Sequence, residues 1–402
     1  MDKESNSKNT FDPPASRKAF TTGRNLAPIE RREFLRLMSV WSAITIFPRS
    51  PSVEAAISQA NAQIHKGPGM PGAFPGRVIE VRAANSIVHN HVGSDVVRKM
   101  MERGMAELTG AVTPLKAWQM FFTKEDIVGI KINASGVPGC VSSPEVINEI
   151  IFALNSIGIP NTSIYLYERF PDQIDLAGYH AYVPSRVNIV GIEKRRADFN
   201  GYDKDVYLEA SFFGEEETRS YLAKLVTSLF SKIINVPCLK DHDASGVTGC
   251  LKNIGYGSFN NVARSHRAPI TNTKPFIGQL CNVEPLRSKT VLQIMDGLRG
   301  VYHGGPFAPN QKFMWFPGVL YFGTDPVAID RVELEVIDAK RKEMGAISVW
   351  ERSPKYLAKG NEWQDDPNKN VFIREPGHIE HAGSLGLGVC DLKKIQYLEF
   401  EV

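Results

Sequence analysis

The sequence predicts an α/β protein with a mainly parallel sheet and helices on both of its faces. Short apolar, β-branched runs recur along the chain, amphipathic helical patterns alternate with them, and Gly, Pro or helix-capping residues separate the two. Where strand, helix and strand follow in that order, we expect a parallel pair joined by a right-handed crossover. The 402 residues, 43% of them hydrophobic, are enough to bury a large core.

The first strand–helix–strand units are predicted between residues 77 and 168. They are a strand at 77–88, a helix at 94–108, a strand at 126–132, a helix from Pro144 and a strand at 163–167. Ser143 is a capping residue and Pro144 suits the first helical position, so the start of this second helix is well defined.

The alternation continues to the C-terminus. The predicted elements are a strand at 187–192, a helix at 219–230, a strand at 233–239, a helix from Thr248-Gly249, strands at 290–295 and 318–322, a helix from Pro326 and an edge strand at 395–402. Asp325 is expected to cap the helix that Pro326 opens. Asp330, within that helix, is expected on its solvated face.

Three segments make up the predicted domain organisation. Residues 1–62 form a disordered leader with an export signal, residues 63–76 a Gly/Pro-rich connector, and residues 77–402 a single α/β domain.

The leader contains Arg31-Arg32-Glu33-Phe34-Leu35-Arg36 before a short apolar run. This pattern resembles a twin-arginine export signal, and Ala60-Asn61-Ala62 has the small-x-small form of a cleavage site. An Arg-rich surface helix is the alternative. The resemblance implies that the twin-arginine export machinery is a partner and that the protein is periplasmic or otherwise extracytoplasmic.

Composition excludes several classes of protein. The net charge of +3 comes from the leader, and basic and acidic residues are equal in number after residue 62, which argues against a nucleic-acid or anionic-membrane surface. After the leader, no apolar run approaches the ~20 residues of an integral membrane span. The five cysteines form no C-x-x-C pair, so a zinc ribbon or ferredoxin-like cluster is not expected.

The strongest functional signal lies between Lys240 and Asn253. Asp241, His242 and Asp243 follow an apolar run at the expected carboxyl end of a strand, where open α/β sheets hold ligands. Thr248-Gly249 can open a helix whose free N–H groups favour an anion. The segment therefore predicts a site that joins ionisable side chains to an anion-binding helix terminus.

An internal similarity links this segment to an earlier one. Residues 134–140 match residues 244–250 at six of seven places, and each copy follows a lysine, Lys131 or Lys240. One interpretation is two equivalent loops that face a single crevice, with Cys140 close to Cys250. The alternative is a chance recurrence of small loop residues.

Motifs spread over most of the main body resemble the family known as domain of unknown function 362. The matching pieces are Lys131-Ile132-Asn133, Ser143-Pro144-Glu145, Lys240 with His242, Thr248-Gly249-Cys250-Leu251-Lys252-Asn253, His266-Arg267, Asp296-Gly297, Gly305-Pro306, Asp325-Pro326-Val327-Ala328-Ile329-Asp330 and Gly386-Leu387-Gly388. The resemblance implies an α/β domain with a shared site and names no reaction.

The candidate residues fall into three roles. The expected acid–base residues are His242, His266 and Asp296. The expected anion-binding residues are Lys131, Lys240, Thr248, Gly249, Lys252 and Asn253. The expected ligands for a divalent metal (zinc, iron or manganese) are His242, Asp243 and His266. The structural alternatives are a hydrogen-bonding His242, a solvated loop around His266, a turn at Asp296 and ordinary surface lysines.

Two hypotheses of function follow. The first is an exported enzyme that uses a metal or another cofactor on a small anionic substrate. The second is a non-catalytic periplasmic ligand-binding protein or a cofactor-assembly accessory protein. The signatures of serine hydrolases, zincins and nucleotide-binding loops are not found in the sequence.

Overall fold

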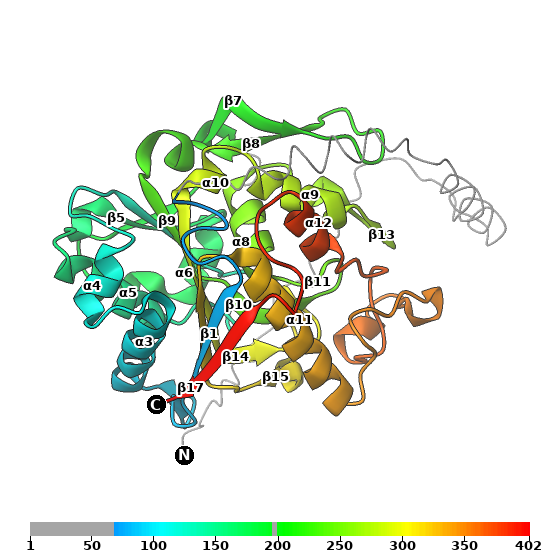
Figure 1. Ribbon diagram of the computed structural model, residues 1–402. Helices are drawn as coiled ribbons and strands as arrows, with labels where there is room; N and C mark the ends of the chain where they lie inside the picture. The colour runs from blue at the N-terminus through cyan, green and yellow to red at the C-terminus, as the bar shows by residue number, and fades with distance from the viewer. Residues whose placement is uncertain (1–67, 195–198) are drawn as a thin grey trace, which may run out of the picture. The chain divides into compact units, whose positions relative to one another are not determined.

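The computed structural model describes residues 68–194 and 199–402 (Figure 1). The twin-arginine motif, the cleavage site and residues 63–67 of the connector lie outside the described residues. None of the helices within the described part has the length and apolar character that crossing a bilayer requires.

A large sheet forms the centre of the protein. Its strands are β1 (Arg77–Arg82), β4 (Val128–Lys131), β5 (Ile164–Glu168), β6 (Asn188–Gly191), β9 (Lys232–Asn235), β10 (Cys238–His242), β11 (Gly246–Val247), β14 (Thr290–Val301), β15 (Met314–Trp315), β16 (Val319–Gly323) and β17 (Gln396–Glu401). The main order is β17-β1-β16-β14-β9-β4-β5-β6, with β10 and β15 also paired to β14.

The sheet is mainly parallel, as predicted. Every hydrogen-bonded pair from β14 through β9, β4 and β5 to β6 is parallel, and so is the pair of β10 with β14. In the main order only β16 runs against its neighbours, β1 and β14. The C-terminal strand β17 lies at one edge, where the sequence pattern placed it.

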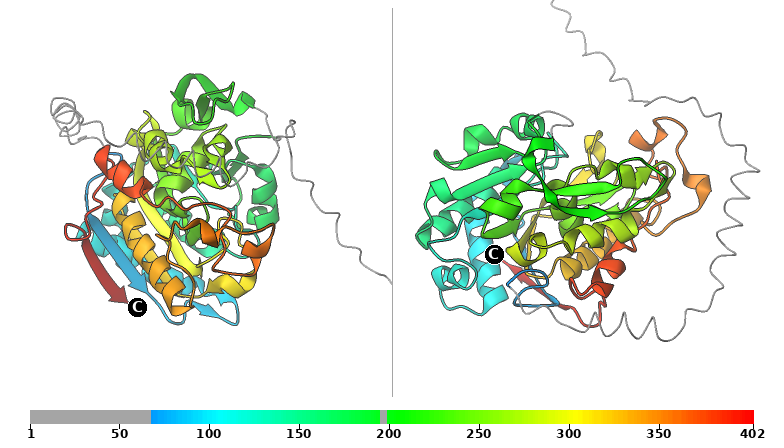
Figure 2. Two further views of the ribbon diagram at one scale, coloured as in Figure 1. Left: turned by 90° about the vertical axis from the view of Figure 1, so that its right-hand side faces the viewer. Right: turned by 90° about the horizontal axis from the view of Figure 1, so that it is seen from above.

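Helices cover both faces of the sheet (Figures 1 and 2). On one face are α3 (Ser94–Thr109), α4 (Pro114–Gln119) and α5 (Pro144–Ser156), and on the other are α8 (Gly249–Ser258), α9 (Thr273–Cys281), α11 (Pro326–Glu343) and α12 (His378–Ser384). Each face has its own apolar core. Successive strand residues alternate between the two cores: Ile233 packs in the core with α8, and Ile234 packs in the core with α5.

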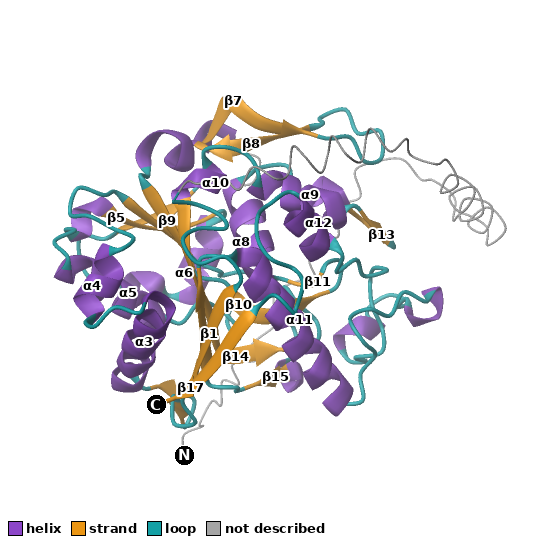
Figure 3. Ribbon diagram, viewed as in Figure 1, coloured by secondary structure: helices purple, strands orange, loops and turns teal. Residues whose placement is uncertain are grey.

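The remaining elements lie outside the central sheet and the main helices that cover it (Figure 3). They include the helices α6 (Pro171–Ala177), α7 (Tyr179–Tyr182) and α10 (Leu286–Lys289), and the two-stranded sheets of β2 (Ile87–Val88) with β3 (His91–Val92), β7 (Tyr202–Glu209) with β8 (Arg219–Ala223), and β12 (His266–Arg267) with β13 (Ile270–Thr271).

The helix starts at Pro144 and Pro326 are confirmed. Asp325 caps α11 as predicted, because its Oδ1 accepts the Ala328 N–H at 2.9 Å. Ser143 occupies the N-cap position of α5 without a side-chain capping bond, and its own N–H is donated to Asp296.

Two predicted elements are wrong. Residues 219–230 do not form an α-helix: Arg219–Ala223 is strand β8, and a π-helical turn follows at Leu225–Leu229. Pairing with β7, including ring contact between Tyr207 and Tyr221, overrides the local helical pattern.

The apolar run at residues 233–239 is two strands, β9 and β10. Pro237 lies between them and has no N–H for a ladder hydrogen bond. Its carbonyl still accepts the Asp296 N–H at 2.8 Å, so both strands stay on β14.

Asp330 is fully buried rather than solvated. Its carboxylate accepts the N–H of Cys250 at 2.5 Å and of Leu251 at 3.0 Å, in the first turn of α8. This contact fixes the N-terminus of α8 to α11, because a carboxylate satisfies amides that have no partner within their own helix.

We predict that Asp330→Ala lowers the free energy of unfolding by about 1–3 kcal/mol, since two buried N–H groups lose their acceptor. Urea unfolding followed by circular dichroism measures the change. Glu335→Ala is the matched control on the same helix: the Glu335 side chain is 51% exposed and pairs with Arg331, so its loss is expected to cost less than about 1 kcal/mol. Equal effects of the two substitutions would contradict the assigned role of Asp330.

Candidate functional site

Three parallel strands end at the same edge of the sheet with ionisable residues. β4 ends at Lys131, β5 ends at Glu168 and β10 ends at His242. The helix α8 follows β10 and β11 in the chain and packs over this edge from one face (Figure 1). This is the edge at which open α/β sheets bind ligands.

A cavity of about 190 Å³ lies at this edge. Its lining consists of Lys131, Asn133, Ser135, Glu168, Arg169, Phe170, Gln173, Thr248, Lys252, Asn253, Tyr256, Gly257, Val262, Pro306 and Phe307. The volume suits a molecule well below the size that typical pockets of ~300–1,000 Å³ accept. Four of the predicted anion-binding residues, Lys131, Thr248, Lys252 and Asn253, therefore meet around one small cavity.

Lys131 is neutralised by a carboxylate. Its Nζ lies 2.9 Å from Glu168 Oε2 and 3.3 Å from Asn253 Oδ1, and it also donates to the Ile132 carbonyl. These three acceptors use all three N–H bonds of the ammonium group. Burial lowers the pKa of Lys131, and the Glu168 charge opposes that shift.

Lys240 is held by neutral oxygens. Its Nζ donates to Asn133 Oδ1 at 2.7 Å, to Ser135 Oγ at 3.1 Å and to the Pro306 carbonyl at 3.0 Å. Within the described part of the chain, no carboxylate forms an ion pair with it. Lys240 is fully buried beneath the cavity lining, so it acts on the cavity through its electrostatic field and not by direct contact.

Lys252 differs from both other lysines. It is 8% exposed and lines the cavity, yet among residues 68–194 and 199–402 no acceptor or carboxylate pairs with its Nζ. The Nζ lies 4.2 Å from the centre of the Tyr256 ring. Burial, and then the charge of Lys240, lower the pKa of Lys252 to about 7.

His242 is buried, and a backbone N–H group decides which of its ring nitrogens carries the proton. Its Nδ1 accepts the Ala244 N–H at 3.0 Å, so the neutral ring carries its proton on Nε2. Burial first, and then the charge of Lys252, hold the pKa of His242 well below its usual value. A ring in this form offers Nε2–H as a donor and has no free lone pair for a metal.

His266 is the opposite tautomer, with its proton on Nδ1. Ser265 Oγ lies 2.8 Å from the Val262 carbonyl, which can only accept, so the hydroxyl proton is assigned there. Tyr256 and His266 Nδ1 then both donate to Ser265 Oγ, at 2.7 and 2.9 Å. His266 Nε2 is left with a free lone pair. Burial and the charge of Lys252 lower its pKa to about 3, so the ring is neutral at pH 7.

The structure brings His242 and His266 together. Their ring centres are 5.5 Å apart, although 24 positions of sequence separate residues 242 and 266. Asp296 is not brought to them: its oxygens accept the N–H groups of Ser143 at 2.6 Å and Leu298 at 3.0 Å. Asp296 therefore ties α5 to β14, and its expected acid–base role finds no support in these contacts.

The donor atoms around Asp243 do not suit the expected metal site. Within residues 68–194 and 199–402, the group of three ligand atoms that lie within 4.8 Å of one another belongs to Asp241, Asp243 and His303, and neither His242 nor His266 is part of it. Two fully buried guanidinium groups already neutralise these acids: Arg374 lies 3.2 Å from Asp241 and 3.5 Å from Asp243, and Arg341 lies 3.7 Å from Asp241. Because cations of the chain itself occupy this position, the arrangement does not favour a divalent ion.

The N-terminus of α8 already holds internal carboxylates. Asp330 accepts the Cys250 and Leu251 amides, and the Gly249 amide lies against Glu333. The Thr248 N–H is donated to the Lys240 carbonyl at 2.9 Å. The amides of Thr248 and Gly249, expected to bind an anionic ligand, are therefore used within the fold.

The two similar loops meet through Lys240 rather than through their cysteines. Ser135 of the first loop contacts the Lys240 side chain, and Lys240 precedes the second loop. Cys140 packs with Cys238 in a small cluster, whereas Cys250 lies in the core around α8. All five cysteines are free, and the expected proximity of Cys140 and Cys250 is not found.

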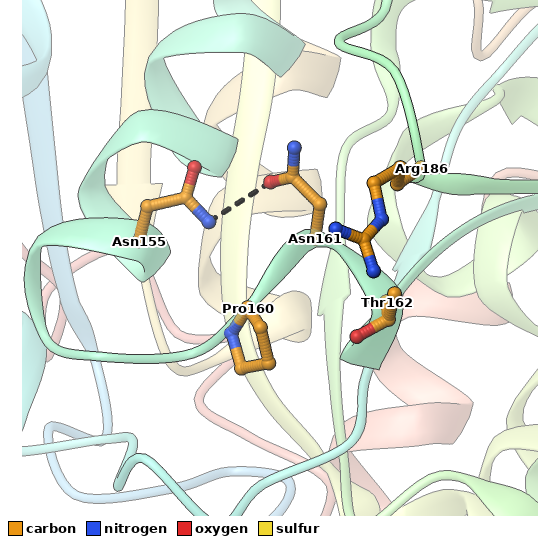
Figure 4. Close-up of a pocket in the computed structure, with 5 residues that line it drawn as sticks. All are labelled: Asn155, Pro160, Asn161, Thr162 and Arg186. Atoms are coloured by element: carbon orange, nitrogen blue, oxygen red, sulfur yellow. Dashed lines mark hydrogen bonds between the residues drawn. The ribbon is translucent and has the colours of Figure 1, made fainter.

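A second hollow in the described part of the chain lacks this combination of groups. It lies at the amino end of β5, where Asn155 Nδ2 donates to Asn161 Oδ1 and Arg186 is the single ionisable residue (Figure 4). Its remaining walls are Pro160 and Thr162 (Figure 4). It is at the opposite end of the strand from Glu168 and has no acid–base pair.

Sequence reasoning missed three residues of this region. Tyr256 is four positions after Lys252 on α8, a helical spacing that could have revealed it. Arg341 and Arg374 come from the end of α11 and from a loop before α12, and nothing in the local sequence connects them with Asp241.

Comparison with known proteins identifies a family for this chain. A family model described as "Domain of unknown function (DUF362)" matches residues 128–335, more than half of the chain. The matched span includes every residue that lines the cavity. Among curated proteins, none matches this chain.

We predict that Lys252→Met stabilises the protein more at pH 6 than at pH 9. The folded pKa of Lys252 is about 7 against 10.5 for the free side chain. The unfolded chain therefore binds more protons between these values, and the stability of the wild type rises with pH across that window. The stability of the methionine variant does not rise in this way. Below pH 7 its free energy of unfolding is therefore expected to exceed that of the wild type by roughly a few kcal/mol, and this difference shrinks toward pH 9.

Chemical denaturation at the two pH values measures this difference. Lys99→Met is the control, because Lys99 is exposed on α3 and its loss is expected to change stability equally at both pH values. A pH-independent effect of Lys252→Met would show that Lys252 is an ordinary ammonium group.

Proposed function

Because the chain belongs to the DUF362 family, whose description names no reaction, we propose a function from its own cavity: an enzyme that binds a small anion beside Lys252 and acts on it with His242 and His266. The proposal keeps the small anionic substrate expected from the sequence. It replaces the expected metal with the charge and the proton donors and acceptors of the chain itself.

The observation that carries the proposal is the unpaired charge of Lys252. A buried ammonium group without a counter-ion is costly, so a fold retains one mainly where a ligand or a reaction compensates it. Among the charged groups at the cavity, Lys131 is paired with Glu168 and Arg169 is paired with Glu193 at 2.8 Å. Lys240 and Lys252 remain uncompensated, so the cavity has the electrostatic potential that attracts an anion.

The two histidines supply complementary proton chemistry. His242 presents Nε2–H as a donor and His266 presents Nε2 as an acceptor, and both rings are neutral at pH 7. Both lie within the electrostatic range of Lys252, which lowers the pKa of each. Neither ring is among the residues that line the cavity, but His266 contacts the cavity residue Tyr256 and His242 contacts His266, each with ring centres 5.5 Å apart. A donor and an acceptor next to a bound anion are the groups that proton transfer on a substrate requires.

We also propose that the protein is exported by the twin-arginine machinery and acts outside the cytoplasm. The support is the sequence motif at residues 31–36 and the apolar run after it. Such an enzyme reaches its substrate in the periplasm or an equivalent compartment.

We predict that small anions bind to the wild-type protein and that Lys252→Met weakens the binding at least about tenfold, or about 1.4 kcal/mol. Isothermal titration calorimetry with pyruvate, malonate and inorganic phosphate measures the affinity. Binding is expected to weaken as pH rises through about 7, because Lys252 then loses its proton.

Lys99→Met, on the opposite face of the sheet, is expected to bind these anions like the wild type. Failure of every anion to bind, or unchanged affinity in Lys252→Met, would sink the proposal. Anion binding that survives replacement of both His242 and His266 by Gln, in a protein that turns over no substrate, would favour the accessory binding protein instead.

For export, we predict that replacing Arg31 and Arg32 by lysine retains the protein in the cytoplasm of a bacterial host that has the twin-arginine machinery. Cell fractionation and immunoblotting measure the distribution of the full-length chain. The control replaces Arg17 and Lys18, which lie in the leader before the motif, and is expected to be exported normally. Equal export of the two variants would contradict the assigned signal.

A further inference from the structure

The three cavity lysines differ in how their Nζ atoms are used. Lys131 and Lys240 each donate to three oxygen acceptors, which requires the ammonium form and leaves no lone pair. Lys252 has none of these acceptors in the described part of the chain, and its Nζ sits over the face of Tyr256 at the cavity wall. Only Lys252 is placed to present a nitrogen lone pair to a ligand.

We propose that Lys252 is an amine nucleophile that forms an imine with the carbonyl carbon of a small carbonyl-bearing anion, of which 2-oxo carboxylates are the simplest class. The inference rests on the proposed function, because it takes the anion of that function and assigns it a reactive carbonyl group. Lys252 then not only attracts the anion by its charge but also forms a covalent bond to it.

The surroundings of Lys252 are those that activate a lysine. A neighbouring cation and burial away from water both disfavour the ammonium form, which is how proteins prepare amine nucleophiles. Lys240 is the neighbouring cation, fixed by Asn133, Ser135 and Pro306, and Lys252 itself is only 8% exposed. These two effects outweigh the attraction of the ammonium form to the face of the Tyr256 ring. At pH 7 the pKa of about 7 leaves a large share of Lys252 as free amine.

Lys240 explains why the substrate should be an anion. Its Nζ donates to three neutral oxygens, so no carboxylate within the described residues cancels its charge. The cavity thus keeps a positive field for a carboxylate while the amine attacks the carbonyl carbon. A neutral ketone has no group that this field attracts.

The reaction balances without an oxidant or a metal. The Lys252 nitrogen forms a bond to the carbonyl carbon, and the carbonyl oxygen takes up a proton to give a carbinolamine. The nitrogen loses its protons as the C–N bond becomes double, and the oxygen leaves as water. One amine and one carbonyl compound give one imine and one water. In this proposal His266 Nε2 accepts and His242 Nε2–H donates the protons, from positions next to the cavity residue Tyr256.

Reductive trapping tests the imine directly. The full chain is incubated with pyruvate and sodium cyanoborohydride, digested, and mapped by mass spectrometry. We expect one reduced adduct, on Lys252, formed at least about tenfold faster than on exposed Lys99, because roughly 10³ times more of a lysine with pKa near 7 is unprotonated at pH 7. Acetone, which has the carbonyl without the charge, is expected to label Lys252 much less.

The pH profile separates Lys252 from surface lysines. Labelling of Lys252 is expected to rise through about pH 7 and then level off, whereas labelling of exposed lysines continues to rise toward about pH 10.4. Lactate, an anion with no ketone, is expected to slow the labelling by competing for the cavity.

Two variants complete the test. Lys252→Arg keeps a cation but cannot form an imine, so it is expected to bind pyruvate and form no adduct at the site, while Lys99→Arg labels Lys252 like the wild type. If Lys252→Arg folds poorly, the map of adducts on the wild-type protein still tests the proposal.

Pyruvate binding with adducts scattered over surface lysines would overturn the imine and leave the anion site intact. Absence of both binding and adduct would overturn the proposed function as well.

Discussion

Two carboxylates of α11 decide where the helix of the cavity can lie. Asp330 accepts the Cys250 and Leu251 amides, and Glu333 lies against the preceding amide of α8, that of Gly249, and accepts the Lys240 N–H at 3.1 Å. These contacts are fully buried, so little water competes for them. Every cavity residue on α8 depends on this attachment, since the helix would otherwise have no fixed orientation over the sheet edge.

Some charges of the site are paired with an opposite charge, and others are not. The two arginines beside Asp241 balance its carboxylate and that of Asp243, in a cluster with no solvent access at the guanidinium groups. Lys131 and Glu168 balance each other at the cavity wall. The positive charges of Lys240 and Lys252 have no carboxylate partner in the described residues. The resulting positive potential gives the cavity its preference for anions.

The tautomers of the histidines follow from the backbone and from one serine. The Ala244 amide points at His242 Nδ1, and Ser265, with its proton on a carbonyl, accepts from His266 Nδ1. Two residues of the same type are thereby given opposite functions, one a donor and one an acceptor. A metal site would need free lone pairs on both rings, which these contacts do not provide.

The sequence by itself determined the class of fold, the helix starts at Pro144 and Pro326, and the strand ends at which the site is built, because these depend on periodicity and on residues a few positions apart. It did not reveal that Pro237 divides one strand into two or that residues 219–223 pair with β7, since sheet pairing joins distant segments. Tertiary structure alone decided which candidates meet. The arginines that neutralise Asp241 and the acids that cap α8 come from about 80 to 130 positions away, and a pKa or a tautomer is set by such neighbours in space.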